Sequence, residues 1–308
     1  MEIEWELASA APQRESLLTI GVFDGVHAGH RYLLNKLRQR AAEKNLLSGV
    51  VTFNPHPQSV LHPGKHLPWL NSLEDRIEAF RNLGIDIIAV LTFTPEVAQL
   101  GARDFMYLLK EYLKMEGIVV GPDFALGRGK EGNIEALQTL GTEMDFTVEV
   151  VPAFTVDGEV VSSTRIRQAL TQGDMKKIRD LMGRHFFLRG KVITSDKRGR
   201  TLGFPTANLE VSRQQALPGN GIYATITQVD DKRFRSATNI GTRPTFGEGK
   251  RTVETHLLGF KGDLYDREIR VEFVQKVRDE LRFPSAEELK VQMKEDVREV
   301  ETILARDS

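Results

Sequence analysis

The segment Gly21–His30 holds two histidines, His27 and His30, in a glycine-rich stretch between an apolar run at 17–20 and a following segment with helical spacing. The N–H groups that begin a helix point outward and carry partial positive charge, so such a turn is an anion site. Its glycines let the backbone approach a phosphate closely. Histidines three residues apart reach the same side of the turn. The residue types predict phosphate binding, with stabilisation of charge at a reacting phosphorus.

Two further groups in the same half of the chain fit this chemistry. The segment Gly121–Phe124, which contains Asp123, directly follows a short apolar run, and Ser163 and Thr164 open another segment with helical spacing, with Arg167 one turn in. Hydroxyls at a helix start together with an arginine form a further phosphate-binding arrangement.

The second half of the chain offers metal ligands and a base. Gly199 and Arg200 could hold nucleotide phosphates, and Thr206 and Asn208, two apart in an extended segment, point to the same side. Hydroxyl and amide oxygens are ligands that Mg²⁺ accepts beside phosphates and water. Glu254, in a strand-like run, is suited to accept a proton from an attacking hydroxyl.

The elements of the first half alternate between buried-strand and amphipathic-helix patterns. Strand-like runs are expected at 17–20, 49–53, 86–91 and 118–120, and helices from about 30 to 44, from Ser72 to a cap at Gly84, and over 105–113 with a stop at Gly117. This alternation predicts an α/β fold, a doubly wound parallel sheet with helices on both faces. The segments that follow its strands, at 21–30, 54–57 and 121–124, should then gather at the edge where such sheets bind ligands.

Beyond about Arg184 the helical spacing gives way to short strands, so we expect domains at 1–184 and 185–308. Strand-like runs separated by turn residues predict a small antiparallel barrel; they lie at 188–194, 221–229, 234–240, 253–260 and 268–274. A terminal helix begins with a capping box at Ser285 and Glu288. Its apolar stripe is interpreted as core packing; the stripe consists of Leu289, Met293, Val297, Val300 and Leu304.

Composition excludes several function classes. The chain has 308 residues, a net charge of −1, and no cysteine, which excludes disulfides, zinc–thiolate sites and thiol nucleophiles. The near-neutral charge argues against nucleic-acid binding through a strong basic field. No apolar run reaches membrane-spanning length and the acidic N-terminus lacks a secretory pattern, so we expect a cytoplasmic protein with small-molecule partners. The sequence gives no oligomeric state.

The motifs of the first half, taken in order, resemble one known enzyme module. Gly-Val-Phe-Asp-Gly-Val-His-Ala-Gly-His, Pro-His-Pro, Val-Gly-Pro-Asp-Phe and Ser-Ser-Thr-Arg-Ile-Arg are similar to the adenylyltransferase module of bacterial bifunctional riboflavin kinase/FAD synthetases. That family belongs to the nucleotidyltransferases with a His-x-Gly-His signature. The resemblance implies nucleotide contacts from Gly21, Phe23, Asp24, Gly25, Asp123, Ser163, Thr164 and Arg167, and catalysis by His27 and His30.

The second half resembles the riboflavin kinase domain of the same family. Pro-Thr-Ala-Asn, Asn-Ile-Gly-Thr-Arg-Pro-Thr, Glu-Thr-His and Arg-Asp-Glu occur in the family's order. The resemblance implies phosphorylation of riboflavin to FMN and adenylylation of FMN to FAD, with ATP as co-substrate and Mg²⁺ required by both steps. It places Arg278 and Glu280 on the flavin side.

The sequence departs from the family pattern at three places, and two alternative functions stay open. Asn54 stands where many relatives carry an acid, Ala125-Leu126 lacks the second aromatic of the family's Asp-Phe-x-Phe-Gly, and the segment 194–197 is less glycine-rich than usual. These departures bear on affinity more than on reaction type. One alternative is another nucleotidyltransferase with the His-x-Gly-His signature, which would lack the kinase motifs. The other is a non-catalytic flavin-binding protein, which would have lost the catalytic positions. The relative efficiency of the two steps, transfer of FMN between sites and preference for reduced flavin stay open.

Overall fold

A computed structural model describes residues 2–64, 67–194, 204–242 and 251–306. The chain forms two compact units, Met1–Ser163 and Thr164–Ser308. The first holds a parallel sheet and the second a barrel, in the predicted order. The sequence places the domain boundary near Arg184 instead, and that boundary stays a prediction.

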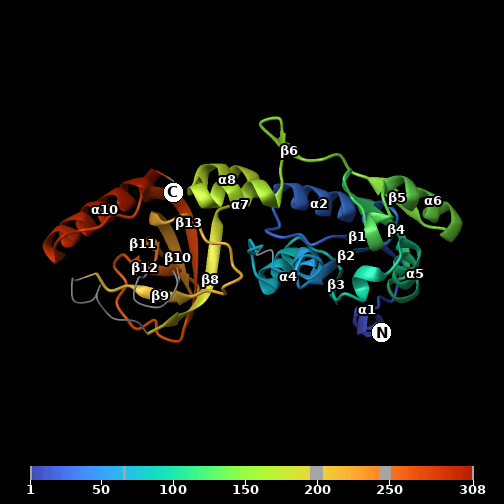
Figure 1. The fold of residues 1–308 in the computed structure, drawn as a ribbon, viewed down its shortest axis with the longest axis horizontal. Coiled ribbons are helices and arrows are strands. Elements are labelled where there is room, and N and C mark those ends of the chain that lie inside the picture. Colours follow the sequence, from blue (N-terminus) through green and yellow to red (C-terminus); the bar gives the residue numbers. More distant parts are fainter. Residues whose placement is uncertain (1, 65–66, 195–203, 243–250, 307–308) are drawn as a thin grey trace. The chain divides into compact units, whose positions relative to one another are not determined.

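In the described part of the first unit, five parallel strands form a sheet in the order β3-β2-β1-β4-β5 (Figure 1). Their bounds are β1 Ser16–Ile20, β2 Leu47–Asn54, β3 Ile87–Thr92, β4 Met115–Val120 and β5 Thr147–Val150. The predicted parallel, doubly wound sheet is confirmed. A small separate hairpin, β6 (Thr155–Val156) and β7 (Glu159–Val160), turns at Asp157 and Gly158, both with positive φ.

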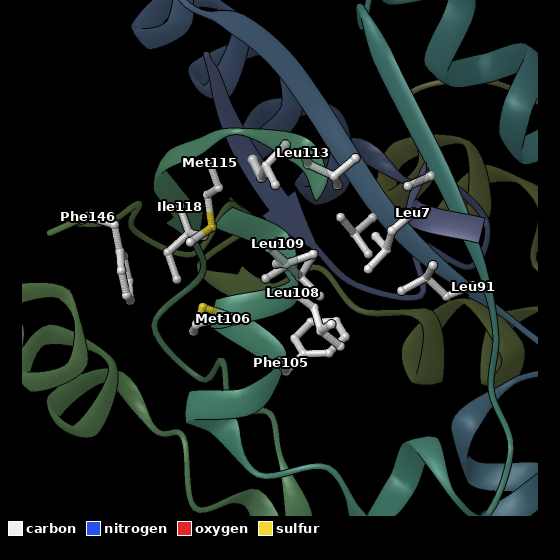
Figure 2. Packing of buried hydrophobic residues seen from close by; sticks show 14 of the residues in the cluster. Leu7, Leu91, Phe105, Met106, Leu108, Leu109, Leu113, Met115, Ile118 and Phe146 are labelled. Carbon is white, nitrogen blue, oxygen red and sulfur yellow. The ribbon is translucent and has the colours of Figure 1, made fainter. Parts of the chain in front are cut away.

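Helices cover both faces of this sheet. The helices that do so are α1 Glu2–Ser9, α2 Ala28–Glu43, α4 Leu73–Asn82, α5 Ala102–Leu113 and α6 Ile134–Met144. The described part of this unit also contains the short helix α3 Pro57–Leu61 and the 3₁₀ turns η1 Val97–Gln99 and η2 Arg128–Lys130. On one face α1, α5 and α6 pack on inward residues such as Leu18 and Ile118, a core shown in Figure 2. On the other face α2 and α4 pack on Leu17 and Val50. Alternate strand residues thus serve opposite cores.

One predicted helix end is wrong. The sequence suggests that the helix over 105–113 stops at Gly117, but α5 ends at Leu113 and Lys114 takes the left-handed conformation with φ of 50°. Gly117 lies inside β4 instead. A Cβ on Gly117 would stand 2.2 Å from Thr147 Oγ1 of the neighbouring strand. This glycine is therefore suited to close strand packing, while the left-handed residue before β4 ends the helix.

In the described part of the second unit, six antiparallel strands close into a barrel in the order β10-β11-β12-β9-β8-β13 (Figure 1). Their bounds are β8 Phe186–Ile193, β9 Ala207–Glu210, β10 Gly221–Val229, β11 Lys232–Thr242, β12 Arg251–Leu257 and β13 Glu268–Arg278. The predicted barrel is confirmed. The short strand β9, which carries Asn208, is the addition to the expected strands and closes the barrel between β8 and β12.

Side chains inside the barrel include a hydrogen-bonded set of hydroxyls. Thr225 Oγ1 lies 2.7 Å from Thr238 Oγ1 and 2.8 Å from Ser236 Oγ, and Thr238 Oγ1 donates to Thr255 Oγ1 at 2.9 Å. All are fully buried. Because neighbouring residues on a strand point to opposite faces, Asn239 and Glu254 face the outside of the barrel.

In the described part of the chain, the helices that accompany the barrel are α8 Met175–Met182 and α10 Ala286–Arg306, and α7 Ser163–Gln172 begins at the last residue of the first unit. The serine half of the predicted capping box is present, since Ser285 Oγ accepts a hydrogen bond from Glu288 N at 3.2 Å, and the same hydroxyl donates to Glu288 Oε1 at 3.2 Å. Helix α10 packs on β10, β11 and β13 from outside the barrel, with Val300, Ile303 and Leu304 buried against Ala224. No helix among the described residues is long and apolar enough to cross a membrane.

Candidate functional site

The Gly21–His30 turn lies where ligands bind in doubly wound sheets. It follows β1, and β1 lies between β2 and β4, so the winding of the sheet reverses beside it. The Gly121–Asp123 turn follows the neighbouring strand β4, and the carboxylate-bearing Asp123 is exposed. Parallel strands end at one edge of the sheet, and the crevice at such a reversal is the general ligand site of this architecture.

The backbone of the turn takes left-handed conformations at several positions. Phe23, Gly25 and Val26 have φ of 53°, 84° and 39°. A β-branched residue such as Val26 rarely adopts positive φ, so the surrounding structure must hold it there.

Hydrogen bonds from the segment before α4 hold this backbone. Leu70 N donates to Asp24 Oδ1 at 2.9 Å, and Gly25 N donates to Asn71 Oδ1 at 2.8 Å. Ser163 Oγ donates to the carbonyl of Asp24 at 3.0 Å. Asp24 is only 2% exposed, so in this structure its carboxylate anchors the turn.

His27 and His30 lie ring against ring, with centroids 3.6 Å apart and planes 15° from parallel. His27 is the N-cap of α2 and its Nδ1 accepts a hydrogen bond from His30 N at 3.3 Å. The edge of Phe23 packs on the His30 ring, with centroids 5.2 Å apart. The predicted convergence of the two histidines is therefore present in the geometry.

The environment favours neutral His30. Burial, and to a lesser degree the charge of the neighbouring His27, lower the pKa of His30 well below its usual value. Its Nδ1 is buried and makes no hydrogen bond within the described residues. Near neutral pH His30 can therefore act as a neutral hydrogen-bonding group, and a bound anion would favour its protonation.

The remaining residues that the sequence predicts to bind nucleotide phosphates are not part of the Gly21–His30 turn. Thr164 and Arg167 are on α7, in the second unit, and their role stays a prediction. Gly199 and Arg200 lie outside the described residues.

On the barrel, register places three predicted or motif residues in one row. Glu254 on β12 pairs with Asn208 on β9 and with Asn239 on β11. Directly paired residues on antiparallel strands point to the same face. The row lies on the outer face, and the carboxylate has an amide side chain on each side.

A cavity of about 330 Å³ opens on this outer face. Its polar side includes Thr206, Asn239, Glu254 and Glu280. The opposing apolar side comes from the segment before α10 and from α10 itself: Leu281, Phe283, Leu289, Met293 and Val297. A flat apolar ring system with a hydroxylated chain would match these two walls.

Arg278 and Asp296 join the barrel to α10 at this cavity. Arg278 Nε and Nη2 donate to Asp296 Oδ1 and Oδ2, each at 2.7 Å, and the guanidinium lies 5.8 Å from the ring centre of Phe283. Gln292 also donates to Asp296. A two-point charge-assisted pair fixes the orientation of both groups. Arg278, predicted on the flavin side, lines the cavity and also holds its helical wall.

Glu280 lines the same cavity. Its Oε2 accepts a hydrogen bond from Asn220 Nδ2 at 3.2 Å. A Cβ on Gly241 would stand 2.7 Å from Glu280 Oε1 and 3.3 Å from Asn239 Nδ2. Both polar groups thus reach the same spot over β11, and a glycine leaves room for them.

The sequence alone missed part of this cavity. The apolar stripe predicts core packing for Leu289, Met293 and Val297, but these side chains line the cavity, whereas Val300 and Leu304 pack on the barrel. The signal was Asp296, an acid set among the apolar positions of the stripe. A carboxylate on an apolar helix face indicates a buried partner.

Comparison with known families follows this division of the chain. The FAD synthetase family model matches residues 9–165, and the riboflavin kinase family model matches residues 182–304.

Named relatives match nearly the whole chain. The bifunctional riboflavin kinase/FMN adenylyltransferase of Escherichia coli K12 is 38% identical over 290 residues, covering 94% of this chain and 92% of its own. Proteins of the same name from Pseudomonas fluorescens and Bacillus subtilis are 39% and 33% identical, over 92% and 93% of this chain and 91% and 92% of their own.

A solved structure described as a macrolide-efflux protein from Streptococcus pneumoniae has a TM-score of 0.87 and 28% identity over 95% of each chain. Its likeness supports the fold and carries nothing about efflux to this chain. The family models, the relatives and the two geometries agree, so this chain belongs to the bifunctional riboflavin kinase/FMN adenylyltransferase family.

Proposed function

We propose that the Gly21–His30 turn performs the adenylylation step of this family and that the cavity on the barrel performs the kinase step. As a member of the family, the chain phosphorylates riboflavin to FMN and adenylylates FMN to FAD. The observation that carries the assignment of residues is the cavity itself. It gathers Thr206, Glu254 and the pair Arg278 and Glu280 from three separate segments, and all four residues are predicted from the sequence.

In the kinase step, Glu254 is the general base. It accepts the proton of the terminal ribityl hydroxyl while the hydroxyl oxygen bonds to the γ-phosphorus of ATP and ADP leaves. The amides of Asn208 and Asn239 flank it in the strand register. The apolar wall from Phe283 and α10 takes the flavin ring, and Arg278 and Glu280 border the flavin. Gly199 and Arg200 are proposed to hold nucleotide phosphates.

The donor set beside Glu254 fits Mg²⁺. Thr206 and Asn208 supply neutral oxygens two residues apart, next to one carboxylate, and a hard cation prefers such ligands. The described residues contain no cluster of three or more His, Cys, Asp or Glu, which suits an ion held largely by phosphates and water. Thr206 and Asn208 would hold it, and when bound it neutralises charge on the phosphate oxygens.

In the adenylylation step, a phosphate oxygen of FMN bonds to the α-phosphorus of ATP and pyrophosphate leaves, with no covalent enzyme intermediate. His27 and His30 stabilise charge that develops on the triphosphate, and the outward N–H groups of the turn bind it. Asp123 contacts the nucleotide, while Ser163, Thr164 and Arg167 bind phosphates. A cytoplasmic location, where ATP is available, is part of the same proposal.

The test uses the whole chain with riboflavin, ATP and Mg²⁺, and separates the flavins by chromatography. We expect FMN followed by FAD. With His30→Ala, FMN should still form and FAD should not. Native-rate FAD synthesis by His30→Ala would remove His30 from the mechanism, and unchanged riboflavin with the native chain would favour a binding protein instead. His62→Ala, an exposed histidine of the same unit, is the matched control.

A further inference from the structure

A buried arginine lies directly behind the Gly21–His30 turn. Arg76, in the first turns of α4, is fully buried. Its Nη1 donates to the carbonyl of Val22 at 2.7 Å. The same nitrogen also donates to the carbonyl of Phe53 and to Thr52 Oγ1, each at 3.3 Å. Arg76 thus ties the turn after β1 to the end of β2.

The charge of Arg76 is buried within electrostatic reach of the carboxylates of Asp24 and Glu74. The guanidinium lies 4.3 Å from the ring centre of Trp69, and Nε makes no hydrogen bond within the described residues. Burying a charge this way is costly, and a neutral donor could satisfy the same carbonyls. A charge in place of a neutral donor acts electrostatically as well, first on the buried carboxylate of Asp24 and also on any anion that the turn binds.

Arg76 remains charged at neutral pH. Burial lowers its pKa to about 10, and the carboxylates of Asp24 and Glu74 act in the opposite direction. Since Asp24 anchors the same turn, the turn is held between a buried acid and a buried base. The charge lies on the inner side of a turn whose outer side is proposed to bind a triphosphate.

We propose that Arg76 is a positioning residue for adenylylation, whose buried charge strengthens the binding of the triphosphate by the Gly21–His30 turn. Its hydrogen bond turns the carbonyl of Val22 inward, and its charge acts on the bound phosphates through a medium that screens poorly. The inference rests on the proposed function of the turn. It goes beyond it by naming a residue that touches no substrate.

The competing explanation is a purely structural arginine. The two explanations predict different effects of ligand charge. Loss of the Arg76 charge alone weakens the binding of anionic ligands and leaves the binding of neutral ligands unchanged. Two competitive inhibitors of FAD formation from FMN and ATP distinguish the two explanations. Pyrophosphate carries the charge without adenosine, and adenosine lacks the charge. Both inhibition constants refer to the adenylylation site alone, whatever ATP the kinase binds.

For Arg76→Met we expect the pyrophosphate inhibition constant to rise about 10- to 100-fold, the effect of one poorly screened charge on another, with the adenosine constant unchanged. Arg81→Met, which removes an exposed arginine from the same helix, should change neither. An unchanged adenosine constant reports that the adenylylation site of the variant is folded, and FMN formation from riboflavin reports on the barrel. Equal weakening of both inhibitors by Arg76→Met would overturn the inference.

Arg76→Lys keeps the test decisive if the methionine variant does not fold. A buried lysine has a depressed pKa, so its charge is lost as the pH rises. Relative to the native chain, pyrophosphate affinity of Arg76→Lys should fall with increasing pH, while adenosine affinity stays flat. A pH-independent ratio would contradict a charge effect. Failure of the proposed function is distinct, since it would appear as full FAD synthesis by His30→Ala.

Discussion

The turn at Gly21–His30 and the cavity on the barrel are proposed to carry out similar phosphate chemistry, but they are built from different kinds of structural elements. The turn uses consecutive residues, and its backbone is fixed by buried anchors such as Asp24 and Arg76. The cavity uses side chains from separate strands and a helix, aligned by register and by the Arg278–Asp296 pair. We therefore expect the activity of the turn to be sensitive to changes in the residues that anchor its backbone. The activity of the cavity should be sensitive to the replacement of single side chains that line it.

The largest expected effect tests the side-chain character of the cavity. Glu254→Gln keeps the shape and removes the base, so FMN formation should fall about 10²- to 10⁴-fold. Adenylylation of supplied FMN should stay at the native rate, because the turn uses none of this row. Rates of both steps, measured separately by chromatography, check this. Near-normal FMN formation would remove Glu254 from the base role.

The next effect concerns the helical wall of the cavity. Arg278→Met leaves Asp296 as an unpaired buried charge, and removing one partner of such a pair typically costs about 3–5 kcal/mol. The side chains of Arg278 and Asp296 are 18% and 6% exposed, so solvent relieves little of this loss. Denaturant unfolding measures it.

The double variant Arg278→Met/Asp296→Leu is the control for this prediction. It removes both charges and should recover much of the lost stability, because no uncompensated ion remains. A double variant less stable than Arg278→Met would show that packing, rather than the ion pair, dominates.

The turn should show a pH dependence of stability through His30. The folded pKa of His30 lies well below its usual value of 6.5. As the pH falls below about 6.5, the histidine is protonated in the unfolded chain but stays neutral in the folded turn. The contribution of His30 to the free energy of unfolding is therefore full above this pH and declines below it. His30→Asn should flatten this part of the stability curve.

Unfolding free energies of both proteins across pH 5–8, roughly the range where histidine titrates, check the sign. His62→Asn, at an exposed site of the same unit, should retain the native slope. In the presence of ATP, the His30 resonance in NMR should titrate at higher pH, because the bound anion favours protonation. An unchanged titration would place ATP away from this ring.

The smallest effects compare two helix caps. Ser72 Oγ accepts from Asp75 N at 3.1 Å and begins α4, which carries Arg76. Ser285 Oγ does the same for α10 beside the cavity. Replacing either serine by alanine should cost about 1 kcal/mol. Ser72→Ala should alter FAD formation more than FMN formation, and Ser285→Ala the reverse. The same rate pattern in both variants would contradict this separation.

Local patterns determined much of what the structure contains. The alternation of strand and helix patterns predicted the parallel sheet, and the capping box at Ser285 and the turn at Gly21–His30 were visible because each involves neighbouring residues. A contiguous turn keeps its chemistry wherever it occurs, since its N–H groups and side chains are fixed by local geometry. The prediction that Gly117 ends a helix is wrong because this glycine is needed for close packing against Thr147 on the neighbouring strand, which no local pattern shows.

Tertiary structure alone decided the remainder. Strand register placed Asn208 and Asn239 beside Glu254 on the outer face, and a shift of one residue would have turned them inward. Packing divided the stripe of α10 between the core and the cavity, and burial turned Arg76 from an ordinary helix arginine into a charge behind the turn. Residue types and spacing fix what groups can do. Which groups meet depends on long-range pairing and burial, which no local pattern records.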